Sequence, residues 1–193
     1  LSQQADTDSS FAFSEAVRSP SLSKLAGGVF PTRKDEEWRY TPLGSILDSC
    51  LAKHTTGALD IGFIDSLKQA MPSAHTIIFL NGEYSEKYSD DPLGLKDAGL
   101  SITHLSQLEG ASLKMAEDII LNSNLTDDNI FQHIALGLSQ AGLFIEVDKN
   151  ADGITPIHII HISTAHSTTA FTNPVNVVRL ANNSHLKIVE QYA

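Results

Sequence analysis

The 193-residue sequence predicts an α+β fold, in which a mixed and mainly helical N-terminal part precedes a part made of β-strands. Apolar residues recur at helical spacing in several segments before residue 140. From Leu143 onward, short β-rich runs follow one another with brief turns and no helix between them. Because βαβ units need a helix between their strands, these runs predict stacked or coiled β structure.

The first segments predict a polar tail and three helices. Residues 1–10 are polar and acidic, as in a mobile tail, and the apolar residues of 13–25 predict a helix. Pro20 is expected to bend or break this helix because proline lacks an amide donor, and Gly27-Gly28 stops it. Two further short helices are predicted over residues 43–51 and 61–70, the second closed by Met71-Pro72.

A hairpin and a third strand are predicted next. Residues 76–80 are apolar and β-branched, and Asn81-Gly82 follows them, a pair that tolerates the positive φ angles of a tight hairpin turn. Residues 83–87 form the predicted return strand. After a loop rich in Gly, Asp and Pro over 89–99, a short strand is predicted near 101–103.

Two more helices precede the strand-rich part. The first is predicted around 113–121. The second is predicted to start at Asp127 or Asp128 as its N-cap and to carry Ile130, Phe131, Ile134, Ala135 and Leu138 on one stripe. Gly137 is expected to weaken it slightly, and Gly142 fits its end.

Four strands are predicted to follow, over 143–147, 156–163, 175–180 and 186–192. Residues 150–153 and Asn182-Asn183-Ser184 supply the turns. The last strand runs up to Ala193 with no capping turn, and would expose unpaired backbone groups as an edge. We therefore expect Ala193 to be a cut through a larger β domain.

Composition excludes several classes of function. Thirteen Lys and Arg against 23 Asp and Glu give a net charge of −10, which argues against nucleic acid or an anionic membrane as the main partner. No apolar run approaches the length of a membrane span, and the start resembles no secretory signal. Cys50 is the single cysteine, so we expect no internal disulfide, no thiolate metal site and a cytoplasmic location.

The histidines are the first candidates for chemistry. His158 and His161 lie on one predicted strand with His166 shortly after, but their opposite parity points the first two to opposite faces. One of them could join distant ligands, although a structural or solvated histidine is favoured. The other five histidines have no ligand-like spacing: His54, His75, His104, His133 and His185.

The carboxylates and the thiol also have structural explanations. Helix capping explains Asp127-Asp128, and a turn before Pro92 explains Asp90-Asp91. Glu190 shares strand parity with Ile188 and Tyr192 and could point into an apolar layer, but a solvent-reaching side chain is favoured. Cys50 is expected to be a buried, inert thiol. No phosphate-binding loop or nucleophile elbow is present, so we assign no catalytic, cofactor-binding or metal-binding residue.

Residues 30–42 form the most distinctive segment. Thr32 can cap a short helix with Asp35 as its reciprocal partner, and Pro42 requires that helix to end before it. Trp38 and Tyr40 supply apolar area beside Arg39. We interpret the segment as a packing anchor that fastens the N-terminal arm to the body, in preference to a ligand site.

Segment 31–41, PTRKDEEWRYT, closely resembles a segment near the start of proteins of the SufB/SufD family. Three later pieces resemble that family in the same order. They are Asn81-Gly82 after an apolar strand, the helix at 128–136 followed by the strand at 142–147, and the strand LKIVEQY at 186–192. Leu136-Gly137 departs from the Leu-Asn expected there.

The resemblance implies that a helical and mixed N-terminal domain leads into the opening rungs of a right-handed parallel β-helix. The implied divisions are residues 1–29 as tail and helix, 30–141 as the mixed domain, and 142–193 as the start of a β-helix that continues past Ala193.

The resemblance also implies a function, because the family acts in iron–sulfur cluster assembly. It implies a non-catalytic scaffold subunit linked to iron acquisition, with a SufB-like subunit and a SufC-like ATPase as partners and without nucleic acid or membrane. A cluster would be carried only transiently by the full complex, and the residues concerned would lie beyond Ala193. The raw β edge also leaves a homodimer open.

Two other functions remain open from the residues alone. A β-helical carbohydrate-active enzyme would explain the β pattern and the acidic balance, and it predicts a groove with grouped carboxylates. A purely architectural, self-assembling β-solenoid is the third alternative.

Overall fold

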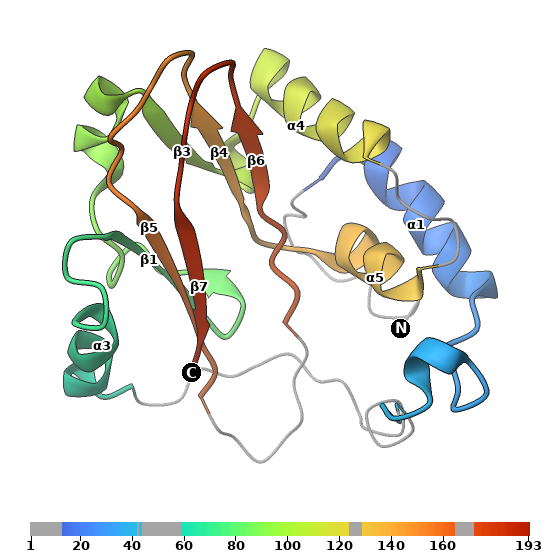
Figure 1. Ribbon diagram of the computed structural model, residues 1–193. Helices are drawn as coiled ribbons and strands as arrows, with labels where there is room; N and C mark the ends of the chain where they lie inside the picture. Colours follow the sequence, from blue (N-terminus) through green and yellow to red (C-terminus); the bar gives the residue numbers. More distant parts are fainter. Residues whose placement is uncertain (1–12, 42, 44–58, 124–128, 165–171) are drawn as a thin grey trace.

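Two β-sheets form the centre of the computed structural model, which describes residues 13–41, 43, 59–123, 129–164 and 172–193 (Figure 1). The first sheet has the strand order β2-β1-β5-β7, and the second has the order β3-β4-β6. The strands of the first sheet are β1 (His75–Leu80), β2 (Glu83–Tyr84), β5 (Ile157–Ile162) and β7 (Ile188–Tyr192). Those of the second are β3 (Leu100–His104), β4 (Leu143–Val147) and β6 (Val177–Leu180).

Helices cover the outer face of each sheet (Figure 1). Helix α3 (Ile61–Lys68) lies beside the first sheet, where Ile64 packs with Ile78 and Ile160. Helices α1 (Glu15–Gly27), α4 (Gly110–Asn122) and α5 (Ile130–Leu138) lie beside the second. A third apolar cluster fills the space between the sheets, so the central strands are buried on both faces.

The strand-rich part consists of two successive turns of chain that lie one on the other. Strand β4 pairs in parallel with β6, with Phe144 opposite Val177, and β5 pairs in parallel with β7, with Ile157 opposite Ile188. Each turn of chain therefore places one strand in each sheet, and the turn at Asn183, where φ is 63°, joins β6 to β7 across the two sheets. The predicted stacking of the strands is confirmed for the described residues after 142, among which no helix occurs, whereas the right-handed β-helix stays a prediction.

Both sheets combine strands from either side of residue 142. Strand β1 pairs in parallel with β5, and β3 pairs antiparallel with β4. The hairpin at Asn81-Gly82 is present, with φ of 53° and 85°, but its return strand has only two residues. The α+β prediction is thus confirmed at the level of a mixed α/β chain with two mixed sheets.

Several local predictions need correction. Helix α1 continues through Pro20 to Gly27. The cap of α5 is Asn129, whose Oδ1 accepts hydrogen bonds from the amides of Phe131 and Gln132 at 3.1 and 3.4 Å. Helix α5 ends at Leu138, so Gly142 lies at the start of β4 and not at the helix end.

Some predictions fall on residues that the structure does not describe. They are the tail at 1–10, most of the helix at 43–51 with Cys50, and the residues His54, Asp127, Asp128 and His166. Among the described residues, no helix is long and apolar enough to cross a membrane.

Gly137 has a packing role beside the slight weakening of the helix expected for it. A Cβ atom there would lie 3.2 Å from Leu22 Cδ2 and 3.5 Å from Leu25 Cδ1, both on α1. The glycine therefore allows α1 and α5 to approach each other closely.

Candidate functional site

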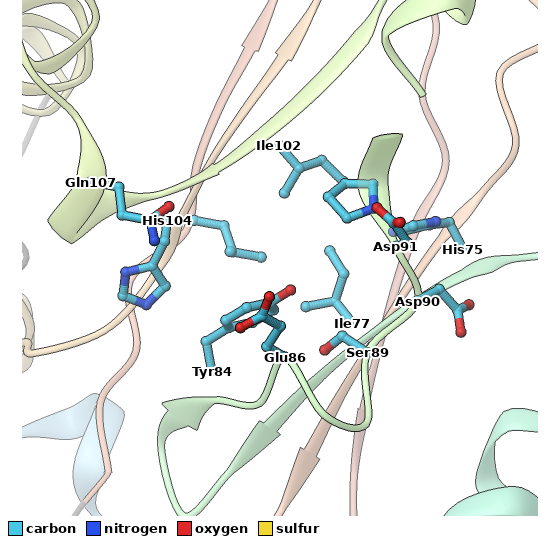
Figure 2. Close-up of a pocket in the computed structure, with 12 residues that line it drawn as sticks. His75, Ile77, Tyr84, Glu86, Ser89, Asp90, Asp91, Ile102, His104 and Gln107 are labelled. Carbon is cyan, nitrogen blue, oxygen red and sulfur yellow. The ribbon is translucent and has the colours of Figure 1, made fainter. Parts of the chain in front are cut away.

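A cavity of about 650 Å³ opens between the first strands of the two sheets (Figure 2). Strand β1 contributes His75 and Ile77, and β3 contributes Ile102 and His104. Tyr84 of β2 and the chain after it close a further side with a set of mainly polar residues, which are Glu86, Ser89, Asp90, Asp91 and Pro92. Figure 2 shows His75 and His104 at opposite ends, with Tyr84 and Glu86 between them. The volume is in the range of small-molecule sites.

The loop after β2 replaces the missing part of the return strand. The Ile78 amide donates to Ser89 Oγ at 2.9 Å, and the Thr76 amide donates to Asp90 Oδ2 at 2.8 Å. The Asp90 amide in turn donates to the Thr76 carbonyl at 2.8 Å. Side chains thereby satisfy the edge of β1, so the turn residues Asp90 and Ser89 fix the wall of the cavity.

Asp90 is neutralised outside the cavity by Lys68 of α3, whose Nζ lies 2.9 Å from its Oδ1. Burial alone would raise the pKa of Asp90, but the hydrogen bonds from Lys68 and the Thr76 amide outweigh burial and lower it. Asp90 is therefore a structural carboxylate that ties α3 to β1, and the turn predicted for it is confirmed in outline.

His75 is a buried imidazole on the cavity wall, with 8% of its surface exposed. Burial lowers its pKa, the nearby charges of Asp90 and Asp91 oppose this, and Lys68 adds to the lowering. Among the residues that the structure describes, none forms a hydrogen bond with its ring. His75 thus places an imidazole of lowered pKa on the cavity wall.

His104 lies at the other end of the cavity and is held by the turn Leu105–Gln107. Its Nδ1 lies 2.6 Å from Ser106 Oγ and accepts the Ser106 amide at 3.4 Å. Burial lowers the pKa of His104, and acceptance of the Ser106 amide at Nδ1 matches the tautomer with its hydrogen on Nε2. Its ring also lies 5.8 Å from that of Tyr84, between centroids.

A second, smaller cavity of about 330 Å³ lies near the ends of β5 and β7. Here His161 is stacked between Phe79 and Tyr192, with centroids 5.2 and 4.7 Å apart, at matching positions of three neighbouring strands. Glu190 Oε1 lies 3.7 Å from His161 Nε2. Burial lowers the pKa of His161, and the Glu190 carboxylate opposes this.

The strand-parity prediction for the histidines is confirmed. His158 is buried on the opposite face from His161, with its Nε2 2.9 Å from Gln191 Oε1. Glu190 shares its face with Tyr192 but leaves 42% of its side chain exposed, as favoured above. In the described part of the chain, no three His, Cys, Asp or Glu side chains lie close enough to hold a metal ion.

The anchor interpretation of segment 30–42 is confirmed for Trp38 and wrong for Tyr40. Trp38 stacks on Phe131 of α5 with centroids 5.0 Å apart, and Phe30 meets the same ring edge-on at 6.1 Å. The Thr32 amide donates to Asp35 Oδ2 at 2.6 Å, but the short helix spans Glu36–Trp38 with Asp35 at its N-cap position, so the prediction that Thr32 caps this helix is wrong. Tyr40 is 88% exposed and does not pack against the body.

The sequence interpretation missed the larger cavity. His75 and His104 lie on strands of different sheets and are distant in the sequence. Their spacing along the chain therefore shows no ligand pattern. The only local signal was the polar loop at 85–91 beside an apolar strand, and a loop of that composition is far more often a plain turn.

Two curated relatives resemble the chain. It is 22% identical over 165 residues to an iron–sulfur cluster assembly SufBD family protein of Synechocystis, which covers 84% of this chain and 35% of the relative. It is 24% identical over 142 residues to the iron–sulfur cluster assembly protein SufD of Escherichia coli, which covers 74% of this chain and 30% of the relative. No protein-family model matches the chain. The chain spans about a third of the length of these relatives, and its similarity to both supports a relationship with the SufB/SufD family.

Proposed function

We propose that the chain forms the N-terminal part of a SufB/SufD-type scaffold subunit that acts in iron–sulfur cluster assembly. The observation that carries the proposal is the parallel stacking of β4 on β6 and of β5 on β7. Such stacking is what successive rungs of a right-handed parallel β-helix require. The names of the two relatives support the same role.

In this proposal the subunit is a non-catalytic protein of the cytoplasm that is linked to iron acquisition. Its partners are a SufB-like subunit and a SufC-like ATPase, and the nascent iron–sulfur cluster is the cargo of the whole complex. The net charge of −10 and the lone cysteine support a protein partner in a reducing compartment.

Co-purification tests the proposal. The full-length protein, tagged and expressed with the SufB-like and SufC-like proteins of its own source, should elute with both at a fixed ratio. A full-length protein that elutes without either partner, at a protein concentration above 10 μM, would overturn the proposed role. The same preparation, assayed on pectin and alginate, tests the carbohydrate-active alternative, for which we expect no turnover.

A further inference from the structure

We propose that the free edge of strand β3 binds an extended, basic peptide segment of a partner protein as an added strand. One apolar side chain of this peptide occupies the larger cavity, with Lys or Arg close to it in the peptide sequence. This inference is independent of the assembly role proposed above. It depends on the hydrogen-bonding pattern of β3, on the side chains beside its edge and on charge.

Strand β3 is the last strand of its sheet, and one row of its backbone groups faces away from β4. The Asp148 amide donates to the Gly99 carbonyl at 2.8 Å, which fixes the alternation of hydrogen bonds along this antiparallel pair. The odd-numbered positions of β3 therefore bond to β4, and the backbone groups of Ile102 and His104 point outward. Among the described residues, no other segment forms a hydrogen bond with these outward groups. Such an edge is a template for a further strand.

The edge of β3 lacks the protection that the edge of β1 has. On β1, the side chains of Ser89 and Asp90 accept the edge amides. On β3, residues 101–104 each keep part of their surface exposed, and the strand contains no proline, lysine, arginine or carboxylate. These are the features with which proteins discourage pairing at an edge, so β3 is open to another chain.

The cavity accounts for an apolar side chain in the peptide. Directly opposed residues of two paired strands place their side chains on the same face of the sheet. The peptide residue opposite Ile102 therefore points to the same side as Ile102, which lines the cavity (Figure 2). The buried residues Ile77 and Leu143 line the same cavity, so a leucine or methionine of the peptide meets apolar surface there.

Charge selects a basic peptide and disfavours a second copy of this chain as the occupant. Glu86 lines the cavity, is exposed and makes no ion pair within the described part of the chain. A lysine two positions from the apolar residue of the peptide lies on the same face and can approach this carboxylate. Two copies of this chain would instead bring together two net charges of −10. A basic segment of a partner protein is therefore the better match.

The experiment titrates the full chain with the blocked peptide Thr-Lys-Val-Leu-Val-Lys-Thr, whose leucine and two lysines share one face of an extended strand. We expect saturable shifts of the Ile102 and His104 amide signals in NMR spectra, with a dissociation constant of about 100 μM. Methylation of the leucine amide nitrogen removes a pairing donor of the peptide and should weaken binding at least about fivefold. Exchange of both lysines for glutamates should also weaken binding at least about fivefold.

Two variants at position 104 separate strand pairing from other contacts. His104 has a φ of −65°, which proline also adopts, and its amide points away from β4, so His104→Pro is compatible with the fold. Both His104→Pro and His104→Ala lose the imidazole, but only His104→Pro loses the outward amide. Peptide binding should be at least about fivefold weaker in His104→Pro than in His104→Ala. Urea unfolding of both variants checks that each is folded.

Three outcomes would overturn the proposal. The first is equal binding of the methylated and unmethylated peptides, or of the peptide to the two folded variants. The second is the absence of saturable binding at about 2 mM peptide. The third is a dimer of the chain alone, seen by sedimentation, that His104→Pro dissociates and His104→Ala leaves intact, because a second copy would then occupy the edge.

Discussion

Gly142 is the position at which one added methyl group should disturb the fold most. A Cβ atom built there would overlap the carbonyl oxygen of Val175 and would lie 2.8 Å from Leu105 Cδ1. The backbone is held in place around it, because the Leu105 amide donates to the Gly142 carbonyl at 2.9 Å and the Val175 amide donates to the Ala141 carbonyl at 3.0 Å. Substitution by alanine must therefore move one of the segments that lead into β4 and β6.

The magnitude follows from what can move. The Leu105 side chain can rotate away. The Val175 carbonyl cannot move as easily, because it belongs to a backbone segment that the hydrogen bond from the Val175 amide to the Ala141 carbonyl holds in place. Overpacking of this kind costs about 1–3 kcal/mol. Loss of one of the two backbone hydrogen bonds adds about 1 kcal/mol. Gly142→Ala should thus lower the free energy of unfolding by about 2–4 kcal/mol, a large fraction of the stability of a domain.

Urea unfolding followed by circular dichroism measures this change. Gly94→Ala is the matched control, because nothing lies within 4 Å of its Cβ position and its φ is not positive. It should change the free energy of unfolding by less than about 0.5 kcal/mol. Gly153→Ala, with φ of 65° and open space, should show only a backbone cost of about 1–2 kcal/mol. The packing explanation fails if Gly142→Ala is no more destabilising than Gly153→Ala.

Three further predictions concern other elements. Asn129→Ala should lower the free energy of unfolding by about 1 kcal/mol, because it removes the cap of α5, and an unchanged urea midpoint would contradict the cap. Acidification should destabilise the chain as pH falls below 6.5, since burial lowers the pKa of folded His161 and the unfolded chain then binds more protons. His161→Phe should reduce that pH dependence in urea titrations at several pH values, and an unaltered slope would refute the assignment. Gly137→Ala should be nearly neutral, as helix propensity offsets the displacement of Leu22, whereas Gly137→Leu should cost about 2 kcal/mol or more in thermal unfolding.

The strands could be predicted because their signals are local. The apolar run before Asn81-Gly82 predicted the strand that became β1. The alternation of side chains along a strand predicted that His158 and His161 lie on opposite faces. The similarity of segment 31–41 to one family was also local, and the two relatives agree with it.

The features that remained hidden depend on which segments meet in space. In the sequence, Gly142 is a glycine that follows a helix, and its close approach to Val175 is visible only in the folded chain. Gly137 is likewise an unfavourable helix residue in the sequence, and its contact with Leu22 is visible only in the folded chain. At the start of α5, the sequence predicted Asp127 or Asp128 as the cap, whereas the side chain of Asn129 accepts two amides. Where this helix begins depends also on its packing against α1, which local propensity does not encode.

The edge strand β1 and the edge strands β6 and β7 differ in how their backbone groups are protected. This difference relates the position of the cavity to the proposed scaffold role. On the β1 side, the side chains of Ser89 and Asp90 accept the edge amides, so the sheet ends there and the space that a longer return strand would fill remains as the cavity. On the other side, β7 presents Tyr192 with 74% of its surface exposed, and β6 presents Leu180 with 51% exposed. Natural proteins usually protect such an edge with charges, proline or a covering loop, and the loop after β2 has that role on the first side alone. A further parallel rung would therefore have β6 and β7 as its pairing partners, at the end of the β structure opposite to the edge of β1 that the loop after β2 protects.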